Sequence, residues 1–204
     1  MKLYGCSGCG STVIEVLLEL AGVAYERDVF AWEDQDAWAR LRTINPKGQV
    51  PTLVLDDGTI LTESAALALW IAEARPEAGL LPTTPRERAL AYGWIVHFAT
   101  AIYEPIVIGD FPERWVDGEA ARTSLKAHAL ERAKRAWLIV EERVEPSPYL
   151  LGPTLSVVDV YAAMLTHWRP GRAWFEAHCP NVMKAVRETE AQPVVASVWA
   201  RNFT

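Results

Sequence analysis

The chain has 204 residues, of which 50% are hydrophobic and 23% are charged, a balance typical of folded globular proteins. Its 20 Lys and Arg residues stand against 26 Asp and Glu residues, and the net charge of −6, without a basic cluster to neutralise phosphates, argues against a nucleic-acid partner. No apolar run approaches the roughly 20 residues that cross a bilayer, no secretory signal opens the chain, and three cysteines cannot complete a disulfide framework, so we expect a cytoplasmic protein with no membrane partner.

The first 76 residues alternate between strand and helix patterns. Apolar residues spaced three and four positions apart predict the first helix, and Thr12 with Glu15 fits a capping box at its start. A tight Asp57-Gly58 turn predicts a hairpin between two later strands. In chain order, we expect strand 2–4, turn 5–10, helix 13–20, strand 25–29, a polar segment of short helix and loops at 30–42, strands 52–55 and 59–61, and helix 65–72. This order predicts a small mixed sheet with helices packed against it.

The rest of the chain carries only helical patterns. The stretch from residue 75 to residue 85 contains three prolines and shows little periodicity. It therefore predicts a linker, which we place at 77–86. Helical periodicity then recurs over 86–108, 125–144, 156–166 and 181–189. We therefore divide the chain into an α/β domain at 1–76, a linker at 77–86 and an all-helical domain at 87–204.

The segment Gly48–Leu53 is the most informative part of the first domain. Pro51 begins a strand, where a proline belongs at an edge or a break because it cannot donate to the ladder. If the Val50–Pro51 bond is cis, the N–H and C=O of Val50 face sideways, and an extended peptide can pair with them as an added strand. An ordinary trans proline at a strand entrance is the alternative.

Glu63 and Ser64 stand at the start of the helix predicted over 65–72. Free N–H groups at a helix N-terminus favour a carboxylate, and Ser64 adds a hydroxyl. The Glu63 carboxylate can pair with an ammonium, so the two residues together suit the head group of an α-amino acid. A plain helix cap is the alternative.

Taken together, these segments resemble the glutathione transferase family. The matching pieces, in family order, are Lys2-Leu3-Tyr4, Ala21-Gly22, Asn45-Pro46-Lys47-Gly48-Gln49-Val50-Pro51, Glu63-Ser64-Ala65, and Gly152 followed by Ser156 and Asp159. The resemblance implies a bacterial-type, two-domain cytosolic member. Its N-terminal domain would be thioredoxin-like with a four-stranded mixed sheet, and its C-terminal domain an all-helical bundle. It further implies a homodimer that takes glutathione as a co-substrate and needs no cofactor and no metal.

The resemblance also assigns the glutathione contacts. It implies that Val50 pairs with the cysteinyl backbone of glutathione next to a cis Pro51, and that Gln49 adds a further contact. It implies that Glu63 and Ser64 hold the γ-glutamyl head group. The Ser156 and Asp159 pair, which can cap each other's backbone amides, resembles the family's buried helix cap, a folding element.

The sequence offers several candidates for the residue that activates the glutathione thiol. A thiol that titrates near 8.5 is mostly protonated at neutral pH, so a family enzyme places a hydrogen-bond donor or a helix N-terminus beside the sulfur. Cys9 comes first among the candidates, because it lies just before the first helix, whose dipole would lower its pKa, and Ser11 comes next. Tyr4 and Cys6 remain alternatives.

The expected activity is conjugation of glutathione to a small hydrophobic electrophile. Trp94, His97, Phe98 and Tyr103 are candidates for the apolar acceptor pocket, and Lys47 or the second subunit for holding the glycyl carboxylate of glutathione. One alternative is a glutathione-dependent disulfide reductase or peroxidase that uses Cys9 with or without Cys6, although Cys6 stands early for a redox cysteine at a helix start. Another alternative is a non-catalytic glutathione-binding member of the family.

Overall fold

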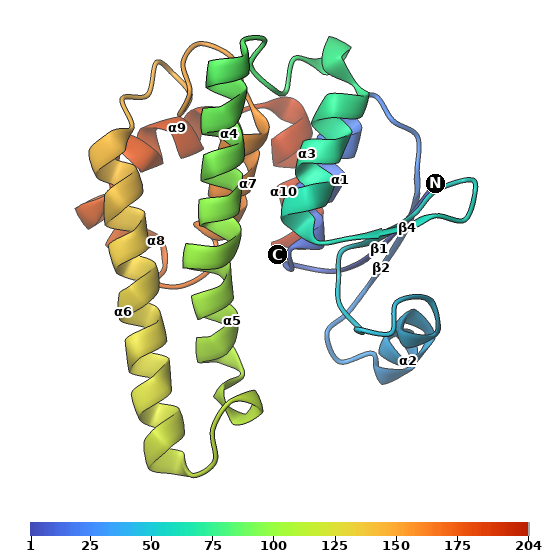
Figure 1. Ribbon diagram of the computed structural model, residues 1–204, viewed down its shortest axis with the longest axis vertical. Coiled ribbons are helices and arrows are strands. Elements are labelled where there is room, and N and C mark those ends of the chain that lie inside the picture. Colours follow the sequence, from blue (N-terminus) through green and yellow to red (C-terminus); the bar gives the residue numbers. More distant parts are fainter. Residues whose placement is uncertain (204) are drawn as a thin grey trace. The chain divides into compact units, whose positions relative to one another are not determined.

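The computed structural model describes residues 1–203, which form two compact units (Figure 1). The first unit contains residues 1–81 together with the segment from residue 190 onward, and the second contains residues 82–189. A mixed sheet with helices makes up the first unit and helices alone make up the regular structure of the second. The predicted fold class, an α/β domain with a mixed four-stranded sheet and an all-helical bundle, is therefore confirmed.

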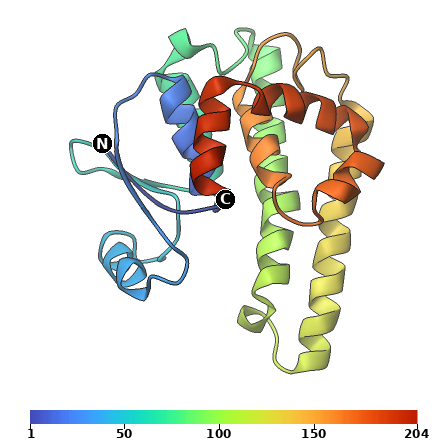
Figure 2. The same ribbon diagram turned by 180° about the vertical axis from the view of Figure 1, so that it is seen from behind.

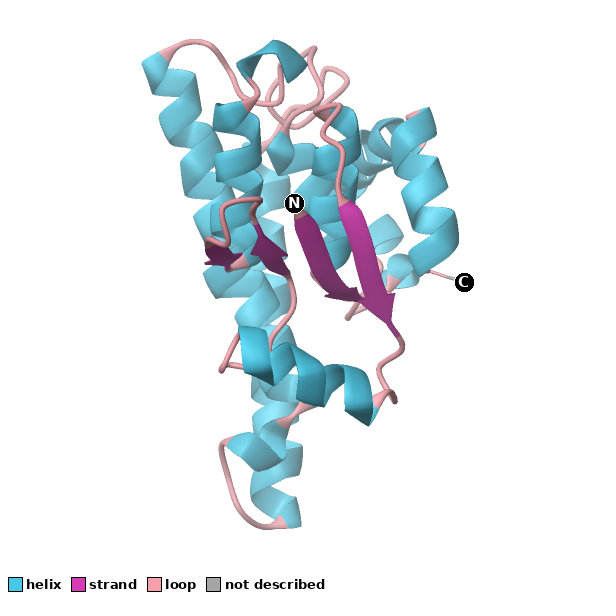
Figure 3. Ribbon diagram, turned by 90° about the vertical axis from the view of Figure 1, so that its right-hand side faces the viewer, coloured by secondary structure: helices cyan, strands magenta, loops and turns pink. Residues whose placement is uncertain are grey.

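The sheet of the first unit has four short strands in the order β2-β1-β3-β4 (Figure 3). Their bounds are β1 Lys2–Cys6, β2 Glu26–Phe30, β3 Thr52–Val54 and β4 Ile60–Thr62. Strand β1 pairs parallel with β2 and antiparallel with β3, with Leu3 opposite Leu53, and β3 pairs antiparallel with β4. The Asp57-Gly58 hairpin predicted from the sequence joins the last two strands.

Helices cover both faces of this sheet. Helices α1 (Ser11–Leu20) and α3 (Ser64–Ala74) pack against each other on one face, and α2 (Gln35–Ile44) lies on the other (Figure 1). A short 3₁₀ turn, Pro76–Ala78, follows α3. Because side chains alternate along a strand, β1 supplies Leu3 to the first face and Cys6 to the second. Cys6 packs there in a buried cluster with Phe30, Ala37, Trp38 and Leu41.

The last helix, α10 (Pro193–Asn202), belongs to the first unit and lies beside α1 (Figure 2). The capping box expected for Thr12 and Glu15 does not form, because Glu15 binds residues elsewhere, among them Arg201 of this helix. Gly10 is the N-cap of α1 and makes no side-chain cap, and the Thr12 hydroxyl has no hydrogen-bond partner. The fully buried Glu15 carboxylate instead accepts from Arg27 at 2.7 Å and pairs with Arg201 of α10 at 2.9 Å. The prediction of a helical domain over 87–204 is therefore wrong for the segment from residue 190 onward, because the buried Glu15 binds α10 to the first unit.

The second unit consists of helices around an aromatic core. Its helices are α4 Pro85–His97, the π-helical segment Phe98–Tyr103, α5 Glu104–Asp110, the 3₁₀ turn Pro112–Arg114, α6 Glu119–Arg143, α7 Val157–Leu165, α8 Arg172–His178 and α9 Pro180–Glu190. The ring of Phe98 lies 5.6 Å from that of Trp137 and 6.2 Å from that of Tyr161, and Trp137 meets Phe175 at 5.0 Å. Since all four rings are fully buried, they form the centre of the unit.

One helical stretch of the second unit is apolar enough to resemble a membrane span. From Pro85 to Asp110 the chain is continuously helical over 26 residues, with a hydropathy of 1.2 in its most apolar window. Its length and composition are sufficient to cross a bilayer, a test that core helices of globular proteins also pass. This stretch packs against α6 and α7 within its unit.

The predicted Ser156–Asp159 helix cap is confirmed at the start of α7. The Asp159 carboxylate accepts from the Ser156 amide at 2.9 Å, from the Ser156 hydroxyl at 2.6 Å and from the Leu150 amide at 2.7 Å. Burial is the main influence on this carboxyl and raises its pKa to about 6, against the lowering effect of these hydrogen bonds.

Candidate functional site

The loop that precedes β3 leaves one backbone edge open. The Val50–Pro51 bond is cis, as the resemblance implied. Asn45 fixes the loop, since its side-chain amide donates to the Gln49 carbonyl at 3.1 Å and to the Thr52 hydroxyl at 2.9 Å. Val50 is half-buried and lies outside the paired strands, and among the described residues no backbone hydrogen bond involves it. Its N–H and C=O are therefore available to an extended peptide.

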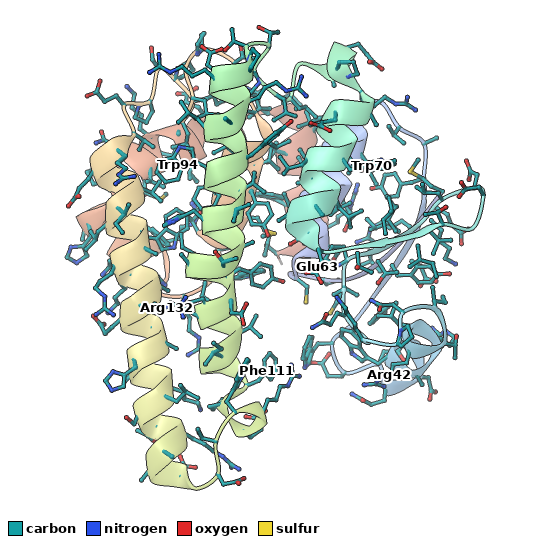
Figure 4. The ribbon with its side chains drawn as sticks, viewed as in Figure 1. Arg42, Glu63, Trp70, Trp94, Phe111 and Arg132 are labelled. Atoms are coloured by element: carbon teal, nitrogen blue, oxygen red, sulfur yellow. The ribbon has the colours of Figure 1, made fainter. Side chains whose placement is uncertain are left out.

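The start of α3 is the second part of the site (Figure 4). Glu63 is the N-cap of this helix and has φ of 68°, a left-handed conformation that a non-glycine residue seldom adopts. Its exposed carboxylate lies 2.8 Å from the Lys47 ammonium. Ser64 follows as the first, buried residue of the helix. An ammonium site thus adjoins free N–H groups at a helix N-terminus, the pairing that an α-amino acid head group requires.

Ser11, the second candidate for thiol activation, forms both hydrogen bonds of its hydroxyl within its own loop. Its hydroxyl accepts from the Cys6 amide and donates to the Cys6 carbonyl, both at 3.1 Å, and its side chain is fully buried. Gly5 makes this possible, because a Cβ at that position would lie 2.6 Å from the Ser11 oxygen. The Ser11 hydroxyl therefore anchors the turn.

Cys6 and Cys9 lie together at the end of β1. Their thiols share a hydrogen bond, which lowers the pKa of Cys6 and raises that of Cys9, and burial raises the pKa of Cys9 further. The expectation that the helix dipole would lower the pKa of Cys9 is therefore wrong, because the partner thiol and burial outweigh it. Cys9 is partly exposed and Cys6 is fully buried.

The remaining candidates in the first unit surround this pair. Tyr4, Cys9 and Val50 all pack against the buried cluster around Cys6, so the turn and the open backbone edge converge there. The Lys2 ammonium lies 4.9 Å from the centre of the Tyr4 ring. Gln49 is exposed, and its carbonyl is held within the loop by Asn45.

Comparison with known proteins shows the family to which the chain belongs. Residues 11–74 match the family model for the N-terminal domain of glutathione S-transferase. YncG of Escherichia coli (strain K12), described as an uncharacterized GST-like protein, is 34% identical over 206 aligned residues, which cover 99% of this chain and 98% of that protein. The chain belongs to the glutathione S-transferase family.

Two solved structures resemble this family member over its whole length. A glutathione transferase homologue from Sulfitobacter, solved with bound glutathione, has a TM-score of 0.88 and 26% identity and covers 100% of this chain and 98% of that one. A glutathione transferase from Methylococcus capsulatus has a TM-score of 0.79 and 28% identity over 100% of this chain and 99% of that one. Both are bacterial, in agreement with the bacterial-type resemblance.

The structure of this family member also contains contacts that sequence reasoning missed. Lys47, suggested for the glycyl carboxylate, instead pairs with Glu63 across 16 positions of sequence. The end of the chain lies against the cysteine turn, since a Cβ at Gly8 would come within 3.4 Å of the Asn202 carbonyl and 3.8 Å of the Phe203 ring. The sequence carries no local signal for either contact.

The aromatic residues suggested for an acceptor pocket divide into two groups. Trp94 and His97 line a hollow of about 800 Å³ within the second unit, together with residues of α6 and of the loop that follows it. The His97 ring nitrogen lies 3.2 Å from the Ala136 carbonyl. Phe98 is part of the aromatic core and Tyr103 packs on Trp168, with ring centres 4.8 Å apart.

Proposed function

We propose that the first unit binds glutathione and that this family member conjugates it to a small hydrophobic electrophile. The observation that carries the proposal is the open backbone edge of Val50, held by Asn45 beside the cysteine turn. An extended tripeptide would pair with that edge through its cysteinyl residue. The family membership and the glutathione-bound Sulfitobacter homologue support this assignment.

The two ends of glutathione would meet different groups. The γ-glutamyl carboxylate would bind at the start of α3, with the Ser64 hydroxyl and the free N–H groups of the first turn. Its ammonium would take the place of Lys47 on the Glu63 carboxylate. Lys47, once released, would be available to hold the glycyl carboxylate, and the exposed Gln49 would add a further contact.

The chemical step requires glutathione as a thiolate, and Cys9 is the residue suited to stabilise it. Because its pKa is raised, Cys9 keeps its hydrogen at neutral pH, and its partly exposed side chain can turn this hydrogen from the Cys6 sulfur to a thiolate sulfur. Ser11 cannot do so while its hydroxyl donates to the Cys6 carbonyl. The thiolate then attacks the electrophilic carbon, a carbon–sulfur bond forms, and the leaving group departs with its electron pair.

The remaining parts of the proposal follow from the family. The helical unit would supply the apolar acceptor pocket, and the enzyme would act as a homodimer in the cytoplasm with no cofactor beyond its co-substrate. Light scattering after size exclusion tests the dimer, which a monomer at micromolar concentration would contradict.

Calorimetric titration and a conjugation assay together test the proposal. S-methylglutathione, which cannot react, should bind the wild-type protein, and Glu63→Gln should weaken that binding by about tenfold because a charge-assisted hydrogen bond is lost. Asp57→Asn, which changes an exposed carboxylate in the β3–β4 turn, is the matched control and should bind normally. Absence of binding to the wild-type protein would overturn the proposal. Binding without turnover of chlorodinitrobenzene or other aryl and alkyl halides would restrict it to a binding protein.

A further inference from the structure

The two cysteines at the end of β1 are held in a tight reverse turn. The Cys9 amide donates to the Cys6 carbonyl at 3.1 Å, which closes the turn Cys6-Ser7-Gly8-Cys9. Gly8 has φ of 69°, a conformation that glycine adopts without strain. A turn of this kind brings its first and fourth Cα atoms within about 7 Å, and a disulfide needs Cα atoms about 4.4–6.8 Å apart. The backbone therefore already has the separation that a disulfide requires.

The side chains are placed as well as the backbone. The two thiols are hydrogen-bonded to each other, and both pack against the same buried cluster of Phe30 and Trp38. Formation of a disulfide would need only a short movement of the sulfurs, because the two thiols are already in hydrogen-bonding contact. The third cysteine, Cys179, is buried in the other unit.

The surroundings of the turn also keep Cys6 in place. Ser11 binds both backbone groups of Cys6, and Gly5 leaves the space that the Ser11 side chain occupies. Cys6 is fully buried while Cys9 is partly exposed. Only Cys9 can therefore meet a disulfide from solution, and Cys6 can react only with Cys9.

We propose that Cys6 and Cys9 form a reversible dithiol–disulfide pair that exchanges electrons with glutathione disulfide, and that the disulfide form has lost the thiol donor used in conjugation. The exchange rests on the geometry of the turn alone. Its effect on conjugation rests on the proposed function, in which Cys9 donates to the glutathione thiolate.

The exchange balances in two steps. Cys6 first loses its proton to solvent, and Cys9 then passes its own proton to the Cys6 thiolate along their hydrogen bond. The Cys9 thiolate attacks one sulfur of glutathione disulfide, forms a mixed disulfide and releases one glutathione thiolate, which takes up the proton from Cys6. Cys6, now a thiolate, attacks the Cys9 sulfur and releases the second glutathione thiolate, which is protonated from solvent. Overall, two protein thiols are oxidised by two electrons, and one glutathione disulfide is reduced to two glutathione molecules.

Differential alkylation with mass spectrometry of the full-length protein tests the exchange. After incubation with glutathione disulfide, the wild-type protein and Cys179→Ala should both lose two hydrogens and become resistant to alkylation at Cys6 and Cys9. Cys6→Ser should stop at a stable glutathionyl adduct on Cys9, and Cys9→Ser should acquire no adduct at Cys6. A wild-type protein that keeps both thiols alkylatable, or a Cys9→Ser protein that becomes glutathionylated at Cys6, would overturn the proposal.

A second pair of measurements separates this proposal from the glutathione site. Bis(2-hydroxyethyl) disulfide, an acyclic disulfide that lacks the glutathione head groups, should also form the protein disulfide, since the turn geometry does not depend on bound glutathione. If the wild-type protein fails to bind S-methylglutathione but bis(2-hydroxyethyl) disulfide closes the disulfide, the proposed function fails and the redox pair stands. Conjugation by the oxidised protein should fall by about tenfold, the loss expected if the glutathione pKa rises by about one unit, and return after reduction. Unchanged conjugation by a fully oxidised protein would remove the link between the pair and catalysis.

Discussion

At the scale of single residues, the most unusual conformation in the first unit belongs to Glu63. A non-glycine residue at φ of 68° costs roughly 1–3 kcal/mol, and such residues persist where the surrounding structure holds them for a function. The exposed ion pair with Lys47 compensates for little of that cost, because solvent screens it. The conformation is explained if the Glu63 carboxylate must face the ammonium of a bound ligand.

Replacing Glu63 with glycine should therefore change stability and binding in opposite directions. Glu63→Gly should raise the free energy of unfolding by about 1 kcal/mol, because glycine relieves the strain at a small cost in chain entropy. The same variant should weaken glutathione binding by at least about tenfold, since it lacks the carboxylate. Glu63→Gln keeps the strain and should weaken binding without stabilising the fold. Urea denaturation and calorimetry measure the two effects, and a Glu63→Gly protein that binds glutathione normally would contradict this role.

The two candidates for thiol activation differ in exposure, since Cys9 is partly exposed whereas Ser11 is fully buried. Ser11→Ala should destabilise the protein by about 2 kcal/mol, because the buried Cys6 amide is left without an acceptor. It should leave the pH dependence of kcat/KM for conjugation unchanged, whereas Cys9→Ala should shift that profile to higher pH by about one pH unit. Ser7→Ala changes an exposed serine of the same turn and serves as the control. A shifted pH profile in Ser11→Ala alone would show that Ser11 activates the thiol.

At the scale of secondary-structure elements, the contribution of the buried α7 cap to the free energy of unfolding depends on pH. Asp159 has its pKa raised from 3.8 to about 6, so between these values the folded chain holds a proton that the unfolded chain has released. Its contribution to the free energy of unfolding is therefore largest below pH about 4 and falls, by roughly 3 kcal/mol in all, as the pH rises to about 6.

Asp159→Asn should remove this dependence. The penalty of the substitution should be larger at pH 4 than at pH 7, by about 3 kcal/mol, because only the wild-type protein gains stability on acidification. Ser156→Ala keeps the Asp159 carboxyl but removes a hydroxyl that lowers the pKa of that carboxyl. The pH range over which stability falls should therefore extend to higher pH in this variant. Urea denaturation at several pH values measures both. An Asp159→Asn penalty that grows as the pH rises would contradict the raised pKa of Asp159.

The elements also show how far the sequence could predict the structure. Periodicity predicted the strands and the longer helices, and the motifs of Val50, Glu63 and Asp159 predicted their positions, because each is encoded within a few residues. The short helices α8 and α10 were missed, since a helix of seven to ten residues gives a weak pattern. The Thr12 capping box was wrong because Glu15 has partners far away in sequence.

The candidate site followed the same rule. Its open edge and helix N-terminus could be predicted, as could a cysteine pair, because they depend on local motifs. The direction of the Cys9 pKa shift could not, since it depends on how deeply the thiol is buried and on its contact with Cys6. Ser11 was a reasonable donor by position, and only the three-dimensional turn shows that its hydroxyl is already used.

At the scale of the whole molecule, the C-terminal segment completes the first unit. Arg201 and Asn202 of α10 both reach the Glu15 carboxylate of α1, which is 0% exposed, at 2.9 Å and 3.2 Å. Arg201 also contacts Glu19. Because Glu15 is charged and fully buried, its partners are required for stability, and the chain end is thereby held against the cysteine turn.

Arg201→Met should therefore destabilise the first unit selectively. It keeps most of the apolar stem but removes one of the two guanidinium groups on Glu15, and since Arg27 remains, we expect a loss of about 2 kcal/mol rather than the 3–5 kcal/mol of a fully unpaired charge. Hydrogen exchange should rise in α1 and α10 and stay unchanged in the aromatic core of the second unit. Arg187→Met breaks an exposed ion pair with Glu176 and should have almost no effect. Equal losses in both variants, or exchange that rises throughout the chain, would show that the buried network does not hold α10 on its unit.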